Sequence, residues 1–183
     1  MRRWKLSGRM TISVRAVAAN ELGNVIETLV ELLIDTVHGG EPLGFLPPLT
    51  RETALDYWLS LRADLRSGRR MLLVASANGR IVGSGQLLLS SWQNSRHRAE
   101  LQKIFVATSC RGQGIGKMLL AALHSAARRR GRSLLVLNTR QGGAAETLYR
   151  GLGYRQSGVL PGWTVGPRGE RYDHVTLYQE LPA

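Results

Sequence analysis

The pattern of apolar and polar residues in the first part of the chain predicts a strand followed by a helix. Residues 11–17 alternate between the two classes, which is typical of a strand with one buried face. From Asn20 to Val37 apolar residues recur at helical spacing, and Asn20 is the expected N-cap. Residues 38–49 are rich in glycine and proline, so a loop is expected there.

A second helix and a hairpin are predicted next. The helix is expected over residues 50–66, with Thr50 as its cap. Two β-rich runs then flank Asn78 and Gly79, a pair that tolerates the left-handed backbone of a tight turn. Residues 71–90 are therefore expected to form a β-hairpin.

The rest of the chain continues with alternating strands and helices. The expected elements are a strand over residues 98–106, a helix from about Gly114 to Arg130, a strand over residues 133–139, a short helix around Tyr149, and strands over residues 154–159 and 172–181. The resulting order, β-α-α-β-β-β-α-β-α-β-β, predicts one mixed α/β domain.

Composition constrains the class of protein and its compartment. The 183 residues include one cysteine, Cys110, which excludes an internal disulfide and a multi-thiolate metal site, and no spacing of ligand residues indicates a metal. A single cysteine favours a reducing compartment, so a cytoplasmic protein is expected. No apolar run reaches the roughly 18 residues of a membrane span. Residues 1–10 are basic and lack the apolar core of a secretory signal, so we interpret them as a short, poorly ordered extension before a single domain over residues 11–183.

The net charge of +12 indicates an anionic partner. Part of the charge has a structural explanation, because Arg128, Arg129 and Arg130 followed by Gly131 are ordinary residues for the end of a helix. Nucleic acid is disfavoured, since the basic residues do not form a long block and no aromatic residues lie between them. A phosphate-rich small molecule is the better expectation.

The segment CRGQGIGK, residues 110–117, is the candidate site for such a molecule. It is not a P-loop, because Arg111 stands where the first glycine should be and Met118 where the metal-binding hydroxyl should be. It is not a dinucleotide fingerprint either, because Lys117 or Leu119 replaces the third glycine. Three glycines at alternate positions before a helix still leave backbone N–H groups open to a pyrophosphate.

This segment resembles the acetyl-CoA loop of the GNAT superfamily of N-acetyltransferases, which has the pattern [Q/R]-x-x-G-x-G between a strand and a helix. Arg111, Gly114 and Gly116 match that pattern. The later segment AAETLYRGLGY resembles the A-x-x-L-Y-x-x-x-G-[FY] segment of the same superfamily, through Ala145, Leu148, Tyr149, Gly153 and Tyr154. The order of the predicted elements is also that of the superfamily, so the resemblance covers nearly the whole domain.

Within the superfamily, the chain is most similar to the tabtoxin-resistance acetyltransferases, which acetylate a β-lactam amino-acid toxin. The segments HRAELQKIFV, DTVHGGEPLGF and GVLPGWTVGPRGERYDHVTLYQEL carry this narrower resemblance. It implies acetyl transfer from acetyl-CoA to the amine of a small molecule, such as an amino-acid-like toxin or antibiotic. Protein amino groups, aminoglycosides and polyamines remain open as acceptors, and a CoA- or RNA-binding module without catalysis remains open as a different class of function.

The resemblance also implies a fold and a cofactor site. The fold is α/β, with a central, mixed, mostly antiparallel sheet that is flanked by helices and splayed at the acetyl-CoA site. The chain is expected to act on a small molecule away from membranes, as a monomer or a homodimer. The residues assigned to acetyl-CoA are Ile104, Phe105, Val106, Arg111, Gly112, Gln113, Gly114, Ile115, Gly116, Lys117, Asn138, Ala145 and Tyr149.

Two residues are the candidates for catalysis. The acceptor amine arrives protonated, because such amines have pKa values of roughly 8 to 10. By resemblance, Glu100 is the expected base, acting through water, and Tyr149 is the expected acid at the departing sulfur. Two structural alternatives stay open: Glu100 as an exposed carboxylate paired with Arg98 or His97, and Tyr149 as an aromatic packed on the core.

The acceptor is expected to contact the loop after the first helix and the walls of a cleft. The residues expected at the acceptor are Asp35, His38, Phe45, Trp92 and Glu100, with Trp163 as a further wall. Two positions depart from the family pattern. Gly143 replaces a cofactor-binding asparagine, and Asn138 replaces an acidic residue. As an amide, Asn138 can position water or bind the pantetheine amides but cannot act as a base.

Overall fold

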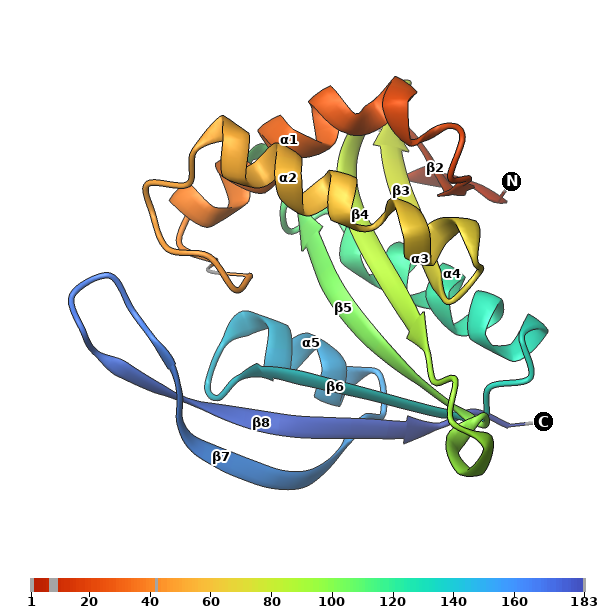
Figure 1. The fold of residues 1–183 in the computed structure, drawn as a ribbon, viewed down its shortest axis with the longest axis vertical. Coiled ribbons are helices and arrows are strands. Elements are labelled where there is room, and N and C mark those ends of the chain that lie inside the picture. The colour runs from red at the N-terminus through yellow and green to blue at the C-terminus, as the bar shows by residue number, and fades with distance from the viewer. Residues whose placement is uncertain (1, 7–9, 42, 183) are drawn as a thin grey trace.

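One eight-stranded sheet organises the chain, of which this computed structural model describes residues 2–6, 10–41 and 43–182. The strands lie in the order β1-β2-β3-β4-β5-β6-β8-β7. Every neighbouring pair is antiparallel except β5 and β6, which are parallel. The expected mixed, mostly antiparallel sheet is therefore confirmed (Figure 1).

The elements follow one another in a simple order. The strands are β1 (Arg2–Leu6), β2 (Met10–Val17), β3 (Arg70–Ala77), β4 (Arg80–Leu89), β5 (Arg98–Val106), β6 (Leu134–Arg140), β7 (Arg155–Val165) and β8 (Arg171–Glu180). The helices are α1 (Leu22–His38), α2 (Arg51–Ser60), α3 (Arg62–Arg66), α4 (Ile115–Arg129) and α5 (Ala144–Gly151). Two short 3₁₀ turns cover Gln93–Ser95 and Thr108–Cys110.

Helices cover both faces of the sheet, so the sheet carries two cores (Figure 1). On one face, the apolar side of α1 and the buried Trp58 of α2 pack against Leu72 and Val74 of β3. On the other face, α4 and α5 pack against side chains that include Leu73 and Ala75. The near-continuous apolar run of β3 follows from this arrangement, because alternate residues enter different cores.

The predicted helices are confirmed with two differences in detail. The helix expected over residues 50–66 is interrupted at Leu61, which separates α2 from α3, while the Thr50 hydroxyl accepts a hydrogen bond from Thr53 N at 3.2 Å as a cap should. The expectation that Asn20 caps α1 is wrong. The cap position is Glu21, and its carboxylate accepts from Ala18 N at 2.9 Å.

The strands differ from expectation mainly at the two ends of the sheet. Residues 2–6, within the segment expected to be a poorly ordered extension, form β1 and pair with β2. The strand expected over residues 154–159 extends to Val165 as β7. Both β1 and β7 are edge strands, whose pairing rests on backbone hydrogen bonds and requires no regular apolar pattern.

The hairpin turn predicted at Asn78 and Gly79 is present in the structure, and its contribution to stability can be tested. Asn78 and Gly79 both have positive φ, 49° and 84°, as a type I′ turn requires. Gly79→Ala is therefore expected to destabilise the protein by about 1 kcal/mol, although a Cβ there would meet open space. Thermal unfolding should show a melting temperature lower by about 2 to 4 °C.

Gly23 provides the matched control for that substitution. It also faces open space, but it lies within α1 and has no positive φ. Gly23→Ala should leave the melting temperature unchanged or raise it, because alanine favours a helix. An equal loss of stability in both variants would contradict the assignment of the cost to the turn.

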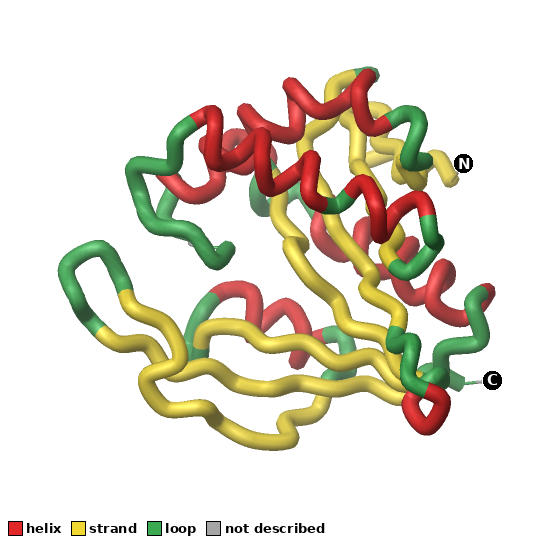
Figure 2. The backbone as a smooth tube through the Cα atoms, viewed as in Figure 1, coloured by secondary structure: helices red, strands yellow, loops and turns green. Residues whose placement is uncertain are grey.

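The sheet is splayed between β5 and β6, as expected. These strands pair only where Arg98–Glu100 lies beside residues 134–136. Beyond that point they diverge, and Figure 2 shows β6, β7 and β8 turning away from the rest of the sheet. Because two parallel strands that separate leave backbone groups unpaired between them, this divergence creates room for a ligand that can hydrogen-bond to a strand edge.

A β-bulge on β5 changes which side chains face that divergence. Gln86 of β4 lies opposite Gln102, whereas Ser84, two residues earlier, lies opposite Phe105, three residues later. Lys103 takes up the extra residue and has a φ of 48°, which is uncommon for a residue with a side chain. As a result the alternation of β5 reverses, and Ile104 packs against the α4 core while Phe105 enters the α1 core.

Candidate active site

A pocket of about 500 Å³ lies at the splayed end of the sheet. It is formed by the end of β5, the glycine segment, the first turn of α4, the start of α5 and the loop after α1. The lining residues are Glu41, Leu43, Ile104, Phe105, Val106, Cys110, Arg111, Gly112, Gly114, Ile115, Gly116, Lys117, Ala144, Ala145, Leu148 and Tyr149. Eleven of the thirteen residues that the resemblance assigned to acetyl-CoA are in this set.

The glycine segment is shaped by left-handed backbone. Gly112 and Gly114 have φ values of 75° and 77°, and a Cβ at either position would meet open space. Gly114 is the N-cap of α4, so the N–H groups of the first helical turn are directed to the pocket end of the helix. Gly116 instead allows α4 and α5 to pack closely, because a Cβ there would lie 3.4 Å from the Leu148 side chain of α5.

The charge at the mouth of this pocket is positive. Arg111 and Lys117 are exposed and both line it. The helix dipole of α4 adds partial positive charge at the same end. The arrangement suits a pyrophosphate, whose oxygens can accept from backbone N–H groups while cations balance the charge.

Tyr149 forms the inner wall of the pocket. Its ring is 7% exposed and stands edge-on to Tyr154, with the ring centroids 5.5 Å apart. Burial raises the pKa of the Tyr149 hydroxyl above its ordinary value, and the negative charge of Glu41 raises it further. The hydroxyl therefore stays protonated at neutral pH and can donate a hydrogen bond into the pocket.

Glu100 lies on β5 at the point where β5 and β6 separate. Its Oε1 accepts a hydrogen bond from Gln102 Nε2 at 2.9 Å. Glu100 and Trp92 line one small hollow of about 180 Å³ on the sheet, so the structure brings together these two residues expected at the acceptor. Trp92 is 76% exposed, which leaves its ring available for a ligand.

A polar network supports this part of β5. Arg70 Nη1 donates to Gln86 Oε1 at 2.7 Å and to Gln102 Oε1 at 2.8 Å, and Gln86 Nε2 donates to the Tyr57 hydroxyl at 2.8 Å. The network therefore runs from α2 through β3 and β4 to Glu100. Because Gln86 is fully buried and its amide is paired at both ends, the orientation of Gln102, and through it of Glu100, is fixed by the fold.

Two of the residues expected to contact the acceptor, Asp35 and His38, accept hydrogen bonds from backbone N–H groups. Asp35 Oδ2 accepts from Thr108 N at 2.9 Å, which ties α1 to the turn before the glycine segment. His38 Nε2 accepts from Leu49 N at 3.1 Å and so fastens the two ends of the loop over residues 39–49. Phe45 of that loop lies edge-on to Tyr57, with centroids 5.4 Å apart.

Three further expected residues lie outside the pockets just described. Gln113 and Asn138 are absent from the lining of the large pocket, and the Asn138 amide oxygen accepts from the Thr176 hydroxyl at 2.6 Å. Trp163 is 56% exposed on the edge strand β7.

The pocket also contains residues that sequence reasoning missed. Ala144 precedes the matched position Ala145, Leu148 is itself a matched position, and Cys110 is the first residue of the segment 110–117, so the sequence carried a signal for all three. Glu41 and Leu43 had no such signal. They reach the pocket because the loop after α1 folds across the end of β5, which a glycine- and proline-rich sequence does not reveal.

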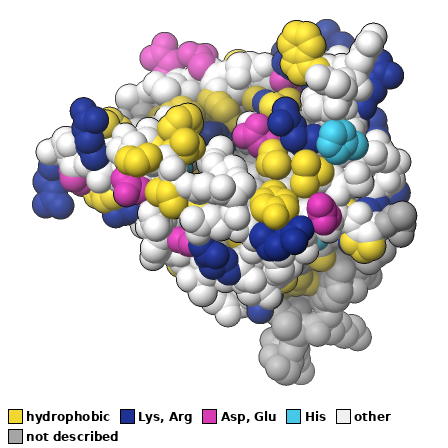
Figure 3. All heavy atoms as spheres, turned by 90° about the horizontal axis from the view of Figure 1, so that it is seen from below, with side chains coloured by type: hydrophobic (Ala, Val, Ile, Leu, Met, Phe, Trp, Pro, Cys, Tyr) yellow, Lys and Arg dark blue, Asp and Glu magenta, His cyan; other side chains and the backbone are white. Residues whose placement is uncertain are grey.

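One face of the molecule carries dispersed positive and negative charges. Figure 3 shows this face, on which Lys and Arg side chains are scattered among hydrophobic and acidic ones. Among the residues with described placement, no helix is long and apolar enough to span a membrane, and no three His, Cys, Asp or Glu side chains gather as a metal site would require.

Comparisons with known proteins agree with this geometry. Residues 68–156 match the family model described as an acetyltransferase (GNAT) domain. An "IAA acetyltransferase" from Azospirillum brasilense is 31% identical over 140 residues, covering 76% of this chain and 82% of that protein. An "L-methionine sulfoximine/L-methionine sulfone acetyltransferase" from Pseudomonas aeruginosa is 30% identical over 148 residues, with the same coverage.

Solved structures share the fold. A ribosomal-protein-alanine N-acetyltransferase from Brucella melitensis has a TM-score of 0.76 and 26% identity, covering 92% of this chain and 99% of that one. The protein yncA from Salmonella typhimurium, solved with its cofactor acetyl-CoA, has a TM-score of 0.72 and 20% identity, covering 93% and 94%. With its family-model match, its relatives at 30% identity or more and its sheet splayed beside the glycine segment, this chain belongs to the GNAT family of acetyltransferases.

Proposed function

We propose that the chain transfers an acetyl group from acetyl-CoA to the amine of a small, amino-acid-like molecule. The observation that carries the proposal is that one strand, β5, contributes residues to two sites. One edge of β5 faces the pocket with the glycine segment and Tyr149, and Glu100 on the same strand faces a separate hollow with Trp92. Direct transfer in a ternary complex requires the amine to reach the thioester, so an acceptor held beside Glu100 must extend along β5 to the donor pocket.

The residues of the large pocket fit acetyl-CoA. Gly112 and Gly114 leave open space at left-handed backbone, where a pyrophosphate can approach the N–H groups of α4. Arg111 and Lys117 supply positive charge for phosphates. The part of β5 beyond Glu100 lacks a strand partner on its β6 side within the described sheet, so its backbone can pair with the amides of a pantetheine chain. When bound, acetyl-CoA supplies the acetyl thioester.

Glu100 and Tyr149 have complementary roles in this proposal. Glu100 accepts a proton from the acceptor ammonium through water, which frees the nitrogen lone pair for attack. Tyr149 donates a hydrogen bond toward the sulfur as negative charge develops there. Because the pKa of its hydroxyl is raised, it stabilises that charge by donating a hydrogen bond and keeps its own proton.

One relative and the size of the hollow favour a small amino-acid-like acceptor. The Pseudomonas aeruginosa relative is described as acting on L-methionine sulfoximine and L-methionine sulfone, both small amino-acid derivatives. The hollow beside Glu100 has a volume of only about 180 Å³, which suits a small molecule better than a folded protein segment. This supports the expectation drawn from the resemblance to the tabtoxin-resistance enzymes.

The donor half of the proposal is tested by calorimetric titration of acetyl-CoA. We expect binding with a Kd below about 1 mM, and about 10-fold weaker binding in Gly114→Ala, whose Cβ enters the pocket. Gly169→Ala is the matched control, because Gly169 also has a positive φ, 84°, with open space around it, but lies in the turn between β7 and β8. Absence of binding, or equal weakening in both variants, would contradict the donor site.

The acceptor half is tested by an amine screen that follows release of the CoA thiol and the mass of the product. The panel contains L-methionine sulfone, L-methionine sulfoximine, spermidine, an aminoglycoside and a peptide with N-terminal alanine. We expect acetylation of the amino-acid derivatives. Acetylation of the peptide alone would overturn the small-molecule assignment while leaving the acetyltransferase assignment intact.

A further inference from the structure

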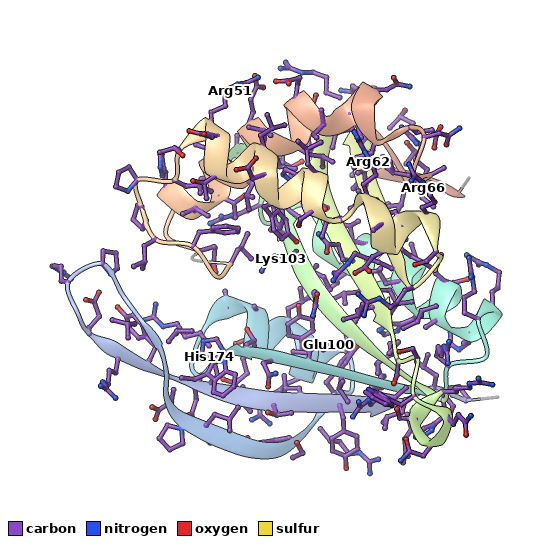
Figure 4. The ribbon with its side chains drawn as sticks, viewed as in Figure 1. Arg51, Arg62, Arg66, Glu100, Lys103 and His174 are labelled. Atoms are coloured by element: carbon purple, nitrogen blue, oxygen red, sulfur yellow. The ribbon has the colours of Figure 1, made fainter. Side chains whose placement is uncertain are left out.

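The bulge on β5 places a lysine on the acceptor side of the sheet. In a regular strand Glu100 and Gln102 face one side, and Lys103 would face the α4 core. The bulge and the left-handed φ of Lys103 instead turn its side chain to the same side as Glu100. Figure 4 shows Lys103 and Glu100 on β5, with the Lys103 nitrogen directed toward the space where β5 and β6 diverge.

The ammonium of Lys103 is half-buried against aromatic rings. Its Nζ lies 5.7 Å from the centroid of the Phe45 ring and 5.5 Å from that of Tyr57. Gly44 lies beside the ammonium on another side. A Cβ at this position would come within 3.3 Å of Nζ, so the absence of a side chain leaves room for the ammonium. Two rings and a glycine hold the cation in position while leaving part of it open.

Lys103 has no carboxylate partner among the residues whose side chains are described, since none of the ion pairs found there includes it. The nearby Arg70 is already engaged, with Gln86 and Gln102 as acceptors and Asp64 Oδ2 at 3.5 Å from its Nε. Burial lowers the pKa of the Lys103 ammonium and the charge of Arg70 lowers it further, while Glu100 opposes this shift. A partly desolvated cation in this setting gains from an added anion.

The side-chain charges of Lys103 and Glu100 are complementary to the carboxylate and the ammonium group of an amino acid. They are three positions apart on β5, so their Cα atoms are at most about 10 Å apart, and both side chains can be reached by one small molecule. An α-amino acid carries its amine and its carboxylate on the same carbon. Lys103 does not line the hollow itself, so the carboxylate must extend from an amine at Glu100 along this face of β5 toward the positive charge of Lys103.

We propose that Lys103 binds the carboxylate of the acceptor and thereby restricts this enzyme to free amino acids and close analogues with an intact acid group. The proposal rests on the proposed function above and names the substrate class of that site. Lys103 acts in substrate recognition and takes no part in proton transfer. Its aromatic neighbours, Phe45 and Tyr57, orient the ammonium.

The test compares L-methionine sulfone with its α-carboxamide as acceptors, for the wild-type protein and for Lys103→Met. We expect the wild type to favour the acid, and Lys103→Met to reduce the acid-to-amide ratio of kcat/KM by about 10-fold, mainly through KM. The two amines differ in pKa, but that difference is the same for both proteins and cancels in the ratio of ratios. Methionine at residue 103 keeps the apolar stem and bears the same backbone strain.

Binding gives a second readout that needs no turnover. With CoA present in place of acetyl-CoA, calorimetry should give a Kd for the amino acid about 10-fold higher in Lys103→Met than in wild type, and Lys103→Arg should restore most of the affinity. Lys117→Met is the matched control, since it removes a cation from the cofactor pocket and should weaken CoA without changing the acid-to-amide ratio.

The possible outcomes separate this inference from the proposed function. If Lys103→Met keeps the wild-type acid-to-amide ratio while acetylating both compounds, Lys103 serves only to pack against Phe45 and Tyr57, and the inference is wrong. If the wild type binds acetyl-CoA and acetylates the amide as well as the acid, the inference is also wrong and the proposed function stands. If the wild type binds no acetyl-CoA, the proposed function itself fails.

Discussion

Replacing Glu100 by glutamine is expected to lower kcat by at least about 100-fold, the usual contribution of a positioned general base. The amide has nearly the same shape as the carboxylate but cannot accept the proton of an ammonium group. Because the amine must then lose its proton to solvent before it binds productively, the variant should recover part of its rate at a pH above the pKa of the amine. The measurement is kcat as a function of pH with L-methionine sulfone as acceptor.

The structure offers a control for the loss of one negative charge. Glu180 lies on β8 and pairs with Arg155 at 3.1 Å, where both side chains are exposed. Glu180→Gln should keep wild-type kcat, since exposed ion pairs contribute little. The affinity for acetyl-CoA, measured by calorimetry, should be unchanged in both variants. A Glu100→Gln enzyme with wild-type kcat at neutral pH would contradict the assignment of Glu100 as the base.

Replacing Tyr149 by phenylalanine is expected to lower kcat by about 100-fold, comparable to the loss of one hydrogen-bond donor from a site of developing negative charge. The ring and its packing on Tyr154 are retained, so the protein should keep its fold and bind acetyl-CoA nearly as tightly. Because burial raises the pKa of the Tyr149 hydroxyl, the wild-type rate should show no loss from its ionisation up to about pH 10. Steady-state kinetics and calorimetry on the same preparations measure both quantities.

Tyr154 is the matched control for Tyr149. Its hydroxyl lies 2.7 Å from His124 Nε2, within the core beneath α4. Tyr154→Phe should therefore cost about 1 kcal/mol of stability, which is typical of a lost hydrogen bond, and leave kcat unchanged. If the two variants lose kcat equally, the effect of Tyr149 comes from packing, the alternative that the sequence left open.

The parts of the site that the sequence could predict follow local backbone rules or match a segment of the family. Gly112 and Gly114 lie at positions whose left-handed backbone favours glycine, so the loop was readable from spacing. The segment that contains Tyr149 lines the pocket because the helix it forms packs directly against the glycine segment. The glycine positions are local, whereas the Tyr149 segment was identified by its resemblance to the family pattern, since its packing joins residues as far apart as Gly116 and Leu148.

The parts that the sequence could not predict depend on long-range packing or on a break in periodicity. One example is the hydrogen bond that Asp35 accepts from Thr108 N, a residue 73 positions away. The alternation of a regular strand would place Lys103 on the face opposite to Glu100. The bulge opposite Gly85 reverses the alternation and brings Lys103 to the same face as Glu100. A bulge depends on tertiary contacts of both strands, so periodicity alone does not reveal it.

The loop over residues 39–49 contributes to both halves of the site. Glu41 and Leu43 line the cofactor pocket, and Phe45 of the same loop supports Lys103 on the acceptor side. Any ligand that changes the conformational freedom of this loop must change the affinity for the other ligand, and linkage makes that effect reciprocal. Kinetically, the two substrates are therefore expected to bind cooperatively, each changing the Kd of the other by the same factor whichever binds first.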